Sequence, residues 1–289
     1  MRLMTFRSEM ETRWGVSTNE GVLDIETARE VLGEDVVPFG PDCEQLPGVV
    51  ELLKQSAGRR ELFLDESDLE FGPCLPVANK IICIGLNYRR HAREANMAEP
   101  AAPILFAKYN NCLASAYDGI DLPTTRHQYD YESELAVVIG KRVKRVSPEE
   151  ALDCVFGYCV ANDLSERELQ MSAGQWTIGK MLDGFLPVGP YLVTPDEVGD
   201  PQNLGIRCWV NGELRQDSNT SDMIFSVADL ISYISCYATL EPGDIIVTGT
   251  PEGVILGMEN KVWLKPGDEV VVEIDKLGRM ANRMTSSDN

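Results

Sequence analysis

Two glutamates spaced two apart, Glu132 and Glu134, open the most apolar strand predicted in their part of the chain. Successive side chains of a strand point to opposite faces, so residues two apart point the same way. The two carboxylates would then lie side by side, with residues 135–139 forming the core behind them. Two like charges so close repel each other, and one becomes protonated unless a cation lies between them. Magnesium, manganese or calcium suits such oxygen ligands.

A simpler interpretation is a solvated strand end with two acids, because exposed carboxylates are common. The apolar stretch that follows the pair favours a metal site. Asp163 could supply a third carboxylate, since it follows a predicted buried strand over 157–162. It could also cap a helix expected over 163–170, which is the more common role of such a residue. Three carboxylates would leave several positions of an octahedral Mg²⁺ or Mn²⁺ for water and substrate.

The chain has two histidines, His91 and His127. On a predicted helix, His91 and Glu94 lie three residues apart and share one face. A carboxylate beside an imidazole fixes its tautomer and raises its basicity, as a general base requires. A solvated surface helix would suit the same charge-rich segment. His127 is expected to be structural or to lie at the rim of the site.

Three basic residues could bind an anionic substrate, namely Lys108, Arg167 and Lys180, although most lysines and arginines are solvated surface charges. Residues 174–180 also match the G-x-x-x-x-G-K pattern of a nucleotide-binding loop. That loop needs Ser or Thr next, and this chain has Met181 instead. The sequence therefore argues against a nucleotide site.

Charge and cysteine content narrow the class of protein. The chain has 26 Lys and Arg against 46 Asp and Glu, a net charge of −20, which argues against nucleic acid or an anionic membrane as partner. Its eight cysteines form no C-x-x-C pair and indicate a reduced, cytoplasmic protein. We expect neither a signal peptide nor a membrane-spanning helix, because no apolar stretch is long enough.

We predict a small N-terminal α+β domain over residues 1–72 and a catalytic domain over 73–289. The first contains a strand–turn–strand over 12–25, turning at 19–21, and helices near 27–32 and 49–56. Strands of the second are expected at 80–85, 104–107, 132–140, 157–162, 205–211, 245–248 and 269–274. Helices are expected from Ser147, with a capping box to Glu150, and over 226–240; the tail 285–289 is expected to be loose. Strands without regular β-α alternation favour a mostly-β α+β fold.

Several motifs, in this order, make residues 78–284 resemble the fumarylacetoacetate hydrolase family. They are Ile84–Tyr88 with His91 and Glu94, Asp130–Leu135, Gly157–Asp163 with Arg167, Lys180 with Asp183–Phe185, Asn211–Gln216, Met223–Phe225, and Leu240–Asp244 with Thr248–Pro251. The resemblance implies a β-rich roll or sandwich that carries the site, a small N-terminal domain and a homodimer.

The resemblance also implies roles for individual residues. The ligands of Mg²⁺ or Mn²⁺ would be Glu132, Glu134 and Asp163. A water-activating dyad on a lid that orders with substrate would be His91 and Glu94. Residues that hold or polarise substrate would be Lys108, Gln170, Lys180 and Thr250. The stretch between Gln170 and Lys180 is short and contains Gln175–Trp176. Because this region lines the pocket in members of the family, the choice of substrate is the property that the resemblance predicts least well.

The expected function is hydrolysis of a carbon–carbon bond in a 2,4-dioxo acid of the acylpyruvate type. His91 would activate the water, Lys180 or Lys108 would stabilise the oxyanion, and pyruvate and a carboxylic acid would leave. The expected partner is a small anionic 2-oxo acid. Alternatives on the same site are oxaloacetate-type decarboxylation and 2-hydroxy-diene-dioate isomerisation. A catalytically silent scaffold is a further alternative.

Overall fold

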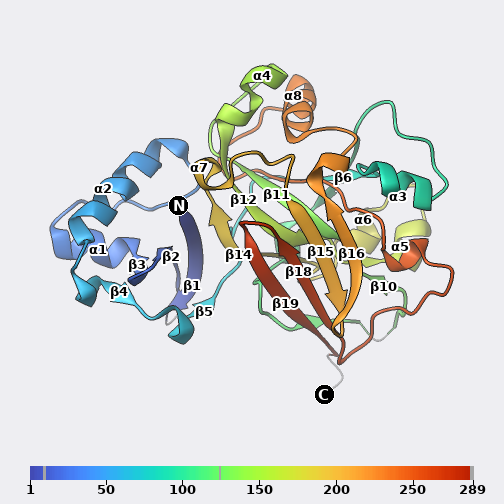
Figure 1. Cartoon of the computed structure of the whole chain (residues 1–289), viewed down its shortest axis with the longest axis horizontal. Helices are drawn as coiled ribbons and strands as arrows, with labels where there is room; N and C mark the ends of the chain where they lie inside the picture. Colours follow the sequence, from blue (N-terminus) through green and yellow to red (C-terminus); the bar gives the residue numbers. More distant parts are fainter. Residues whose placement is uncertain (9–10, 124, 287–289) are drawn as a thin grey trace.

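A computed structural model of the chain describes residues 1–8, 11–123 and 125–286. The fold is α+β and dominated by two sheets, as predicted (Figure 1). Within these residues, no helix has both the length and the apolar character needed to cross a membrane.

The larger sheet is mixed and runs from the N-terminal part into the rest of the chain. Its strands, in spatial order, are β4 (Phe63–Leu64), β3 (Gly21–Asp24), β2 (Glu11–Thr18), β1 (Arg2–Ser8), β14 (Leu186–Val193), β12 (Val155–Asn162), β11 (Ser133–Ile139), β17 (Ile245–Val247), β6 (Ile81–Gly85) and β7 (Ile104–Lys108). Two short strands join it at the side, β5 (Glu70–Phe71) on β1 and β8 (Leu113–Ala114) on β14.

The second sheet lies across β11 and β12 (Figure 1). Its strands, in order, are β16 (Glu213–Asn219), β15 (Gly205–Val210), β18 (Glu269–Ile274), β19 (Gly278–Thr285) and β9 (Ile120–Asp121). A separate pair joins β10 (Tyr129–Asp130) to β13 (Ser165–Glu166).

The helices are short and lie around these sheets (Figure 1). The α-helices are α1 (Ile25–Leu32), α2 (Leu46–Ser56), α3 (Arg89–Glu94), α4 (Pro148–Ala151), α5 (Arg167–Met171), α6 (Thr177–Lys180), α7 (Pro195–Val198) and α8 (Val227–Tyr237). The 3₁₀ helices are η1 (Cys43–Gln45), η2 (Arg60–Leu62), η3 (Glu66–Asp68), η4 (Asn110–Cys112), η5 (Leu152–Cys154), η6 (Thr220–Asp222) and η7 (Ile255–Gly257).

Strand β11 is buried on both faces, which places the start of this strand deep in the molecule. Leu135 and Val137 belong to the core shared with β15, β18 and α8, whereas Ala136 and Val138 belong to the core that also contains α1 and α2. This alternation is the period of two expected of a strand. Glu134 has the parity of Ala136, so its carboxylate enters an interior lined by protein on all sides.

The N-terminal part is joined to the larger sheet by β1. Arg2 and Leu3 pair antiparallel with Val193 and Leu192 of β14. The predicted hairpin and both helices of this part are present, and Asp24 caps α1 by accepting hydrogen bonds from the backbone N–H groups of the first turn. The boundary at residue 72 stays a prediction.

Besides several two-residue strands, four long strands were not predicted because their sequences lack a period-two apolar pattern. They are β1, β14, β16 and β19. Strand β14 contains Pro187 and the pair Gly189–Pro190, residues that usually mark turns, and β16 is a polar edge strand. Non-local pairing with neighbouring strands sets these segments, so local sequence is a poor guide to them.

Three local predictions were wrong. The helix expected over 163–170 begins only at Arg167, because β13 intervenes and the side chain of Glu166 caps α5. No side-chain capping bond forms at Ser147; the reciprocal capping box of this chain forms at the start of α8. In the expected loose tail, residue 285 ends β19, and residues 287–289 lie outside the described residues.

Candidate active site

Three buried carboxylates meet at the start of β11. Glu134 lies on β11 and Asp163 directly after β12, and these two strands are antiparallel neighbours. The backbone N–H of Asp163 donates to the carbonyl oxygen of Glu132 over 2.9 Å, which brings the strand ends together. One carboxylate oxygen from each of the three residues lies within 4.8 Å of the others. Asp163 is therefore part of the cluster and not a helix cap.

Cations of the chain already neutralise two of these carboxylates. Lys180 Nζ lies 2.7 Å from Glu132 Oε2 and 2.8 Å from Asp163 Oδ2. Arg167 Nη2 lies 2.6 Å from Glu132 Oε1, and Lys108 Nζ lies 2.7 Å from Asp163 Oδ1. Burial alone would raise the pKa of Glu132, but Lys180 and Arg167 outweigh it and lower that pKa. Glu132 is therefore ionised in the folded protein.

Glu134 has the opposite electrostatic environment. Burial, with Asp163 and Glu132 beside it, raises the pKa of Glu134 well above its ordinary value; Lys180 and the hydrogen bond from the Gly249 backbone N–H offset this only in part. A cation between the three carboxylates would restore the ionised form. The all-oxygen donor set and its unbalanced charge therefore fit a hard divalent cation.

The structure places Lys108 differently from the substrate-binding role expected for it. Its ammonium pairs with Asp163 and donates to the carbonyl oxygens of Leu164 (3.0 Å) and Phe185 (2.6 Å). The Lys108 side chain is fully enclosed. Two N–H donors of the Lys108 side chain are thereby used on backbone carbonyls, and its charge is paired with Asp163. Lys108 thus holds Asp163 in place and does not line the cavity described below.

The His91–Glu94 dyad forms as predicted on α3. His91 Nδ1 lies 3.1 Å from Glu94 Oε2, and the Gly253 backbone N–H donates to Glu94 Oε1 over 3.0 Å. The side chains of His91 and Glu94 are 15% and 22% exposed, and both line a cavity, so α3 is not merely a solvated surface helix. The backbone N–H of Arg90 donates to Asp222, which fastens α3 to η6. Lid ordering on substrate binding stays a prediction.

One cavity of about 450 Å³ brings the dyad and the carboxylates together. Its ionisable and polar lining includes the side chains of His91, Glu94, Glu132, Glu134, Arg167, Gln170, Lys180 and Thr250. Gln170 Oε1 accepts a hydrogen bond from Arg167, and Thr250 Oγ1 accepts one from Gln216. His127 lines a different pocket, beside Trp263.

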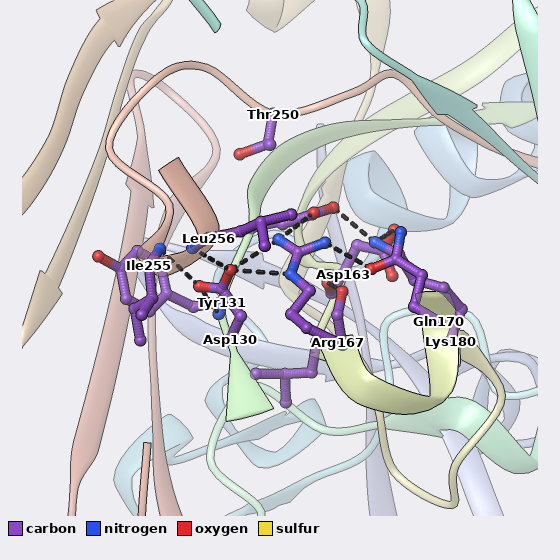
Figure 2. Close-up of polar contacts among 12 residues, drawn as sticks. Asp130, Tyr131, Asp163, Arg167, Gln170, Lys180, Thr250, Ile255 and Leu256 are labelled. Atoms are coloured by element: carbon purple, nitrogen blue, oxygen red, sulfur yellow. Dashed lines mark hydrogen bonds and ion pairs between the residues drawn. The ribbon is translucent and has the colours of Figure 1, made fainter. Parts of the chain in front are cut away.

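Asp130 belongs to the site, although the sequence motifs alone assign it no role. Oδ1 accepts from the backbone N–H groups of Tyr131 (2.9 Å) and Ile255 (2.8 Å). Oδ2 accepts from the Leu256 backbone N–H (3.0 Å) and forms an ion pair with Arg167 (2.7 Å). Figure 2 shows Asp130 between the arginine and the Ile255–Leu256 segment. The signal that could have found it is its spacing of two from Glu132.

Asp130 connects the two halves of the site through Arg167. The guanidinium lies between Asp130 and Glu132, both of which raise its pKa against the opposing effect of burial. The segment held by Asp130 continues into Gly257, where an added Cβ would meet the Glu94 carboxylate 2.7 Å away. The Asp130 carboxylate therefore supports both Glu132 of the carboxylate cluster, through Arg167, and the segment that packs behind Glu94.

Comparison with known proteins agrees with this geometry. The profile of the fumarylacetoacetate (FAA) hydrolase C-terminal family matches residues 80–285. The mitochondrial oxaloacetate tautomerase FAHD2B of Bos taurus is 42% identical over 266 residues, 91% of this chain and 84% of the relative. The mitochondrial oxaloacetate tautomerase FAHD2A of Homo sapiens is 38% identical over 290 residues, 98% of this chain and 91% of the relative.

Solved structures give the same assignment. Maleylpyruvate hydrolase from Sphingobium sp. SYK-6, in complex with manganese(II) and pyruvate, has a TM-score of 0.79 and 31% identity, and the match covers 99% of both chains. A 2-hydroxyhepta-2,4-diene-1,7-dioate isomerase from Mycobacterium marinum has a TM-score of 0.77 and 30% identity over the whole of both chains. The chain belongs to the fumarylacetoacetate hydrolase family, and its site is that of an enzyme of this family.

These comparisons confirm some of the predictions from sequence and leave others untested. The family and the fold class are confirmed, and a divalent metal agrees with both the manganese-bound neighbour and the carboxylate cluster. Enzyme relatives argue against the silent scaffold. The cytoplasmic location and the homodimer stay predictions; the bovine and human relatives are mitochondrial by name.

We expect Glu134→Gln to abolish stabilisation by manganese while leaving the fold intact. The amide keeps the shape of the protonated side chain but removes one anionic ligand. Thermal unfolding with EDTA and with Mn²⁺ measures the effect, and the exposed Glu61→Gln serves as a matched control. An unchanged manganese-dependent rise in Tm in Glu134→Gln would contradict the assignment of the ligand.

The pH dependence of stability should reveal the raised pKa of Glu134. In the metal-free protein, Glu134 keeps its proton in the folded state but loses it in the unfolded state above about pH 4.5. The free energy of unfolding therefore falls as pH rises toward the folded-state pKa, by up to about 1.4 kcal/mol per pH unit. Manganese binds the ionised form, so its stabilising effect grows over the same range. Unfolding by urea in EDTA should show a smaller slope for Glu134→Gln than for the natural chain. Equal slopes would refute the raised pKa.

We expect Asp130→Asn to destabilise the protein by about 3–5 kcal/mol, because it leaves the buried Arg167 with one carboxylate instead of two. Urea unfolding measures the change. The matched control is Asp217→Asn, which removes a surface partner of Arg207 and should cost at most about 1 kcal/mol. Similar small losses of unfolding free energy in both variants would show that Asp130 does not stabilise the fold through Arg167.

Proposed function

We propose that this protein catalyses keto–enol tautomerisation of a 2-oxo acid, with oxaloacetate as the reference substrate. The observation that carries the proposal is the shared cavity, in which the His91–Glu94 dyad faces the same space as the carboxylate cluster. Bovine and human relatives named as oxaloacetate tautomerases, which align over 91% and 98% of this chain, support the choice of reaction.

The dyad supplies the base. The Glu94 carboxyl oxygen accepts the Nδ1–H of His91, so the lone pair of the imidazole lies on Nε2. Nε2 takes a proton from C3 of the keto form, the C3–H electron pair becomes the C2–C3 double bond, and the imidazolium then gives that proton to the 2-oxo oxygen. The reverse transfer returns the keto acid. No atom is lost or gained.

The carboxylate cluster supplies the acid side of the reaction. A divalent cation held by Glu132, Glu134 and Asp163 would act as a Lewis acid on the substrate's oxygens. Lys180 Nζ uses two of its three N–H groups on Glu132 and Asp163, which leaves the third for the developing oxyanion. Burial would lower the pKa of Lys180, but Asp163 and Glu132 outweigh it and raise that pKa, so Lys180 remains a hydrogen-bond donor.

The second candidate is the hydrolysis of an acylpyruvate. It is supported by the dyad, which could equally deprotonate a water, and by the 31% identical maleylpyruvate hydrolase. Water oxygen would bond to the 4-carbonyl carbon, the C3–C4 bond would break, and its electron pair would remain on C3, which is protonated to give pyruvate. Oxaloacetate decarboxylation would also release pyruvate, with carbon dioxide as the other product.

One experiment separates these reactions. The ultraviolet absorbance of enol-oxaloacetate reports tautomerisation, and a coupled assay reports pyruvate release from acetylpyruvate and from oxaloacetate, each with Mn²⁺ and with EDTA. We expect metal-dependent loss of the enol without pyruvate. Pyruvate from acetylpyruvate without tautomerisation would select the hydrolase instead, and pyruvate from oxaloacetate would select the decarboxylase.

We expect His91→Ala to lower kcat for tautomerisation by about 10²–10⁴-fold, the usual contribution of a general base, without weakening Mn²⁺ binding. Kinetics and a manganese titration measure the two effects. His127→Ala, which changes the histidine outside this cavity, should keep the natural rate. Full activity in His91→Ala would overturn the assignment of the base.

A further inference from the structure

The active-site cavity has two chemically different parts. One contains the carboxylate cluster with its cations. The other is formed by four apolar residues that contact one another, Gly85, Ile104, Phe106 and Trp176, which we call the apolar wall. Residues from β6, β7 and the segment before α6, far apart in sequence, therefore build this wall together.

The apolar wall begins directly beside the carboxylate cluster. Lys180 Nζ, which bridges Glu132 and Asp163, lies 5.1 Å from the centre of the Phe106 ring. The rings of Phe106, on β7, and of Trp176, just before α6, are 5.6 Å apart and tilted by 69°, an edge-to-face contact. A substrate held at the cluster would thus direct its remaining substituent along these rings.

Gly85 allows Trp176 to occupy this position. A Cβ at residue 85 would collide with the six-membered ring of Trp176, approaching Cη2 to 2.9 Å, and would lie 3.6 Å from Ile104. The indole thus rests directly on the backbone of β6. A side chain at residue 85 would have to displace it.

The apolar wall carries no cation of its own. Among the lining residues in the described part of the chain, the lysine and arginine side chains are Lys180 and Arg167, and both are bound to protein carboxylates. A carboxylate placed against these four residues would lose hydration there without gaining a matched charge, which is costly. An apolar, planar group would instead gain from burial and ring contact.

We propose that the apolar wall binds an aromatic or other planar apolar substituent on C3 of a 2-oxo acid, which extends the substrate class beyond small dicarboxylates. This inference rests on the proposed enolisation at the same site. The cavity volume of about 450 Å³ lies within the range of pockets for ligands larger than oxaloacetate. In such a substrate the C3–H pair again forms the C2–C3 double bond while the 2-oxo oxygen is protonated.

Phenylpyruvate and oxaloacetate test the proposal, because they undergo the same tautomerisation and differ in the group on C3, phenyl or carboxylate. The natural chain with Mn²⁺ should enolise both. Trp176→Ala should lower kcat/KM for phenylpyruvate about 10- to 100-fold more than it lowers kcat/KM for oxaloacetate. Trp176→Phe should recover part of the loss. Ile178→Ala, an exposed neighbour on α6, is the matched control and should change neither rate.

Gly85→Ala provides a second variant that retains the tryptophan. The added methyl should displace the indole and lower phenylpyruvate turnover selectively, as Trp176→Ala does. Equal losses for both substrates in these variants would overturn the proposal, and so would a natural chain that enolises oxaloacetate but neither turns over nor binds phenylpyruvate.

Calorimetric binding of phenylpyruvate to the Mn²⁺-loaded protein separates this inference from the proposed function. If neither acid is enolised but phenylpyruvate binds and Trp176→Ala weakens that binding, the proposed reaction is wrong and the binding role of the wall stands. If phenylpyruvate binds equally to the natural chain and to Trp176→Ala, the role of the wall is wrong whatever the rates.

Discussion

The structure of the site depends on an unequal sharing of charge among three buried carboxylates. Glu132 and Asp163 each face two cations of the chain, whereas Glu134 faces two anions and a backbone N–H. Buried charges without partners are costly, so this arrangement is stable only with a proton on Glu134 or with a further cation between the three side chains. The same imbalance that weakens the metal-free site favours a further cation, and the oxygen donors suit a hard divalent ion.

This sharing of charge also shapes the rest of the cavity. Lys180 and Arg167 are bound to carboxylates of the cluster, so they fix the positions and balance the charge of those carboxylates. The opposite part of the cavity can then be apolar, with Trp176 resting on Gly85. In the function we propose, substrate recognition is divided between the carboxylate cluster, which binds oxygen atoms, and the apolar wall, which packs against an apolar group.

The fold brings the carboxylate cluster and the dyad together from segments far apart in the chain. Antiparallel pairing of β11 with β12 brings Asp163 to Glu132, and α3 carries the dyad in from the end of β6. Asp130 connects Arg167 with the loop that supports Glu94 (Figure 2). Side chains locked by such a surrounding shell keep the geometry that proton transfer needs.

Spacing along the chain was sufficient to predict the parts of the site that lie within one element. A period of two placed Glu132 and Glu134 together, and a spacing of three on a helix placed His91 beside Glu94, because local backbone geometry alone decides both. Motifs in order indicated the family. Tertiary structure alone decided that Lys108 is enclosed against Asp163, that Asp130 connects two loops, and that polar or proline-containing segments such as β16 and β14 are strands. The reason is physical: burial, ion pairing and strand pairing depend on which distant segments meet, and no single segment encodes its partner.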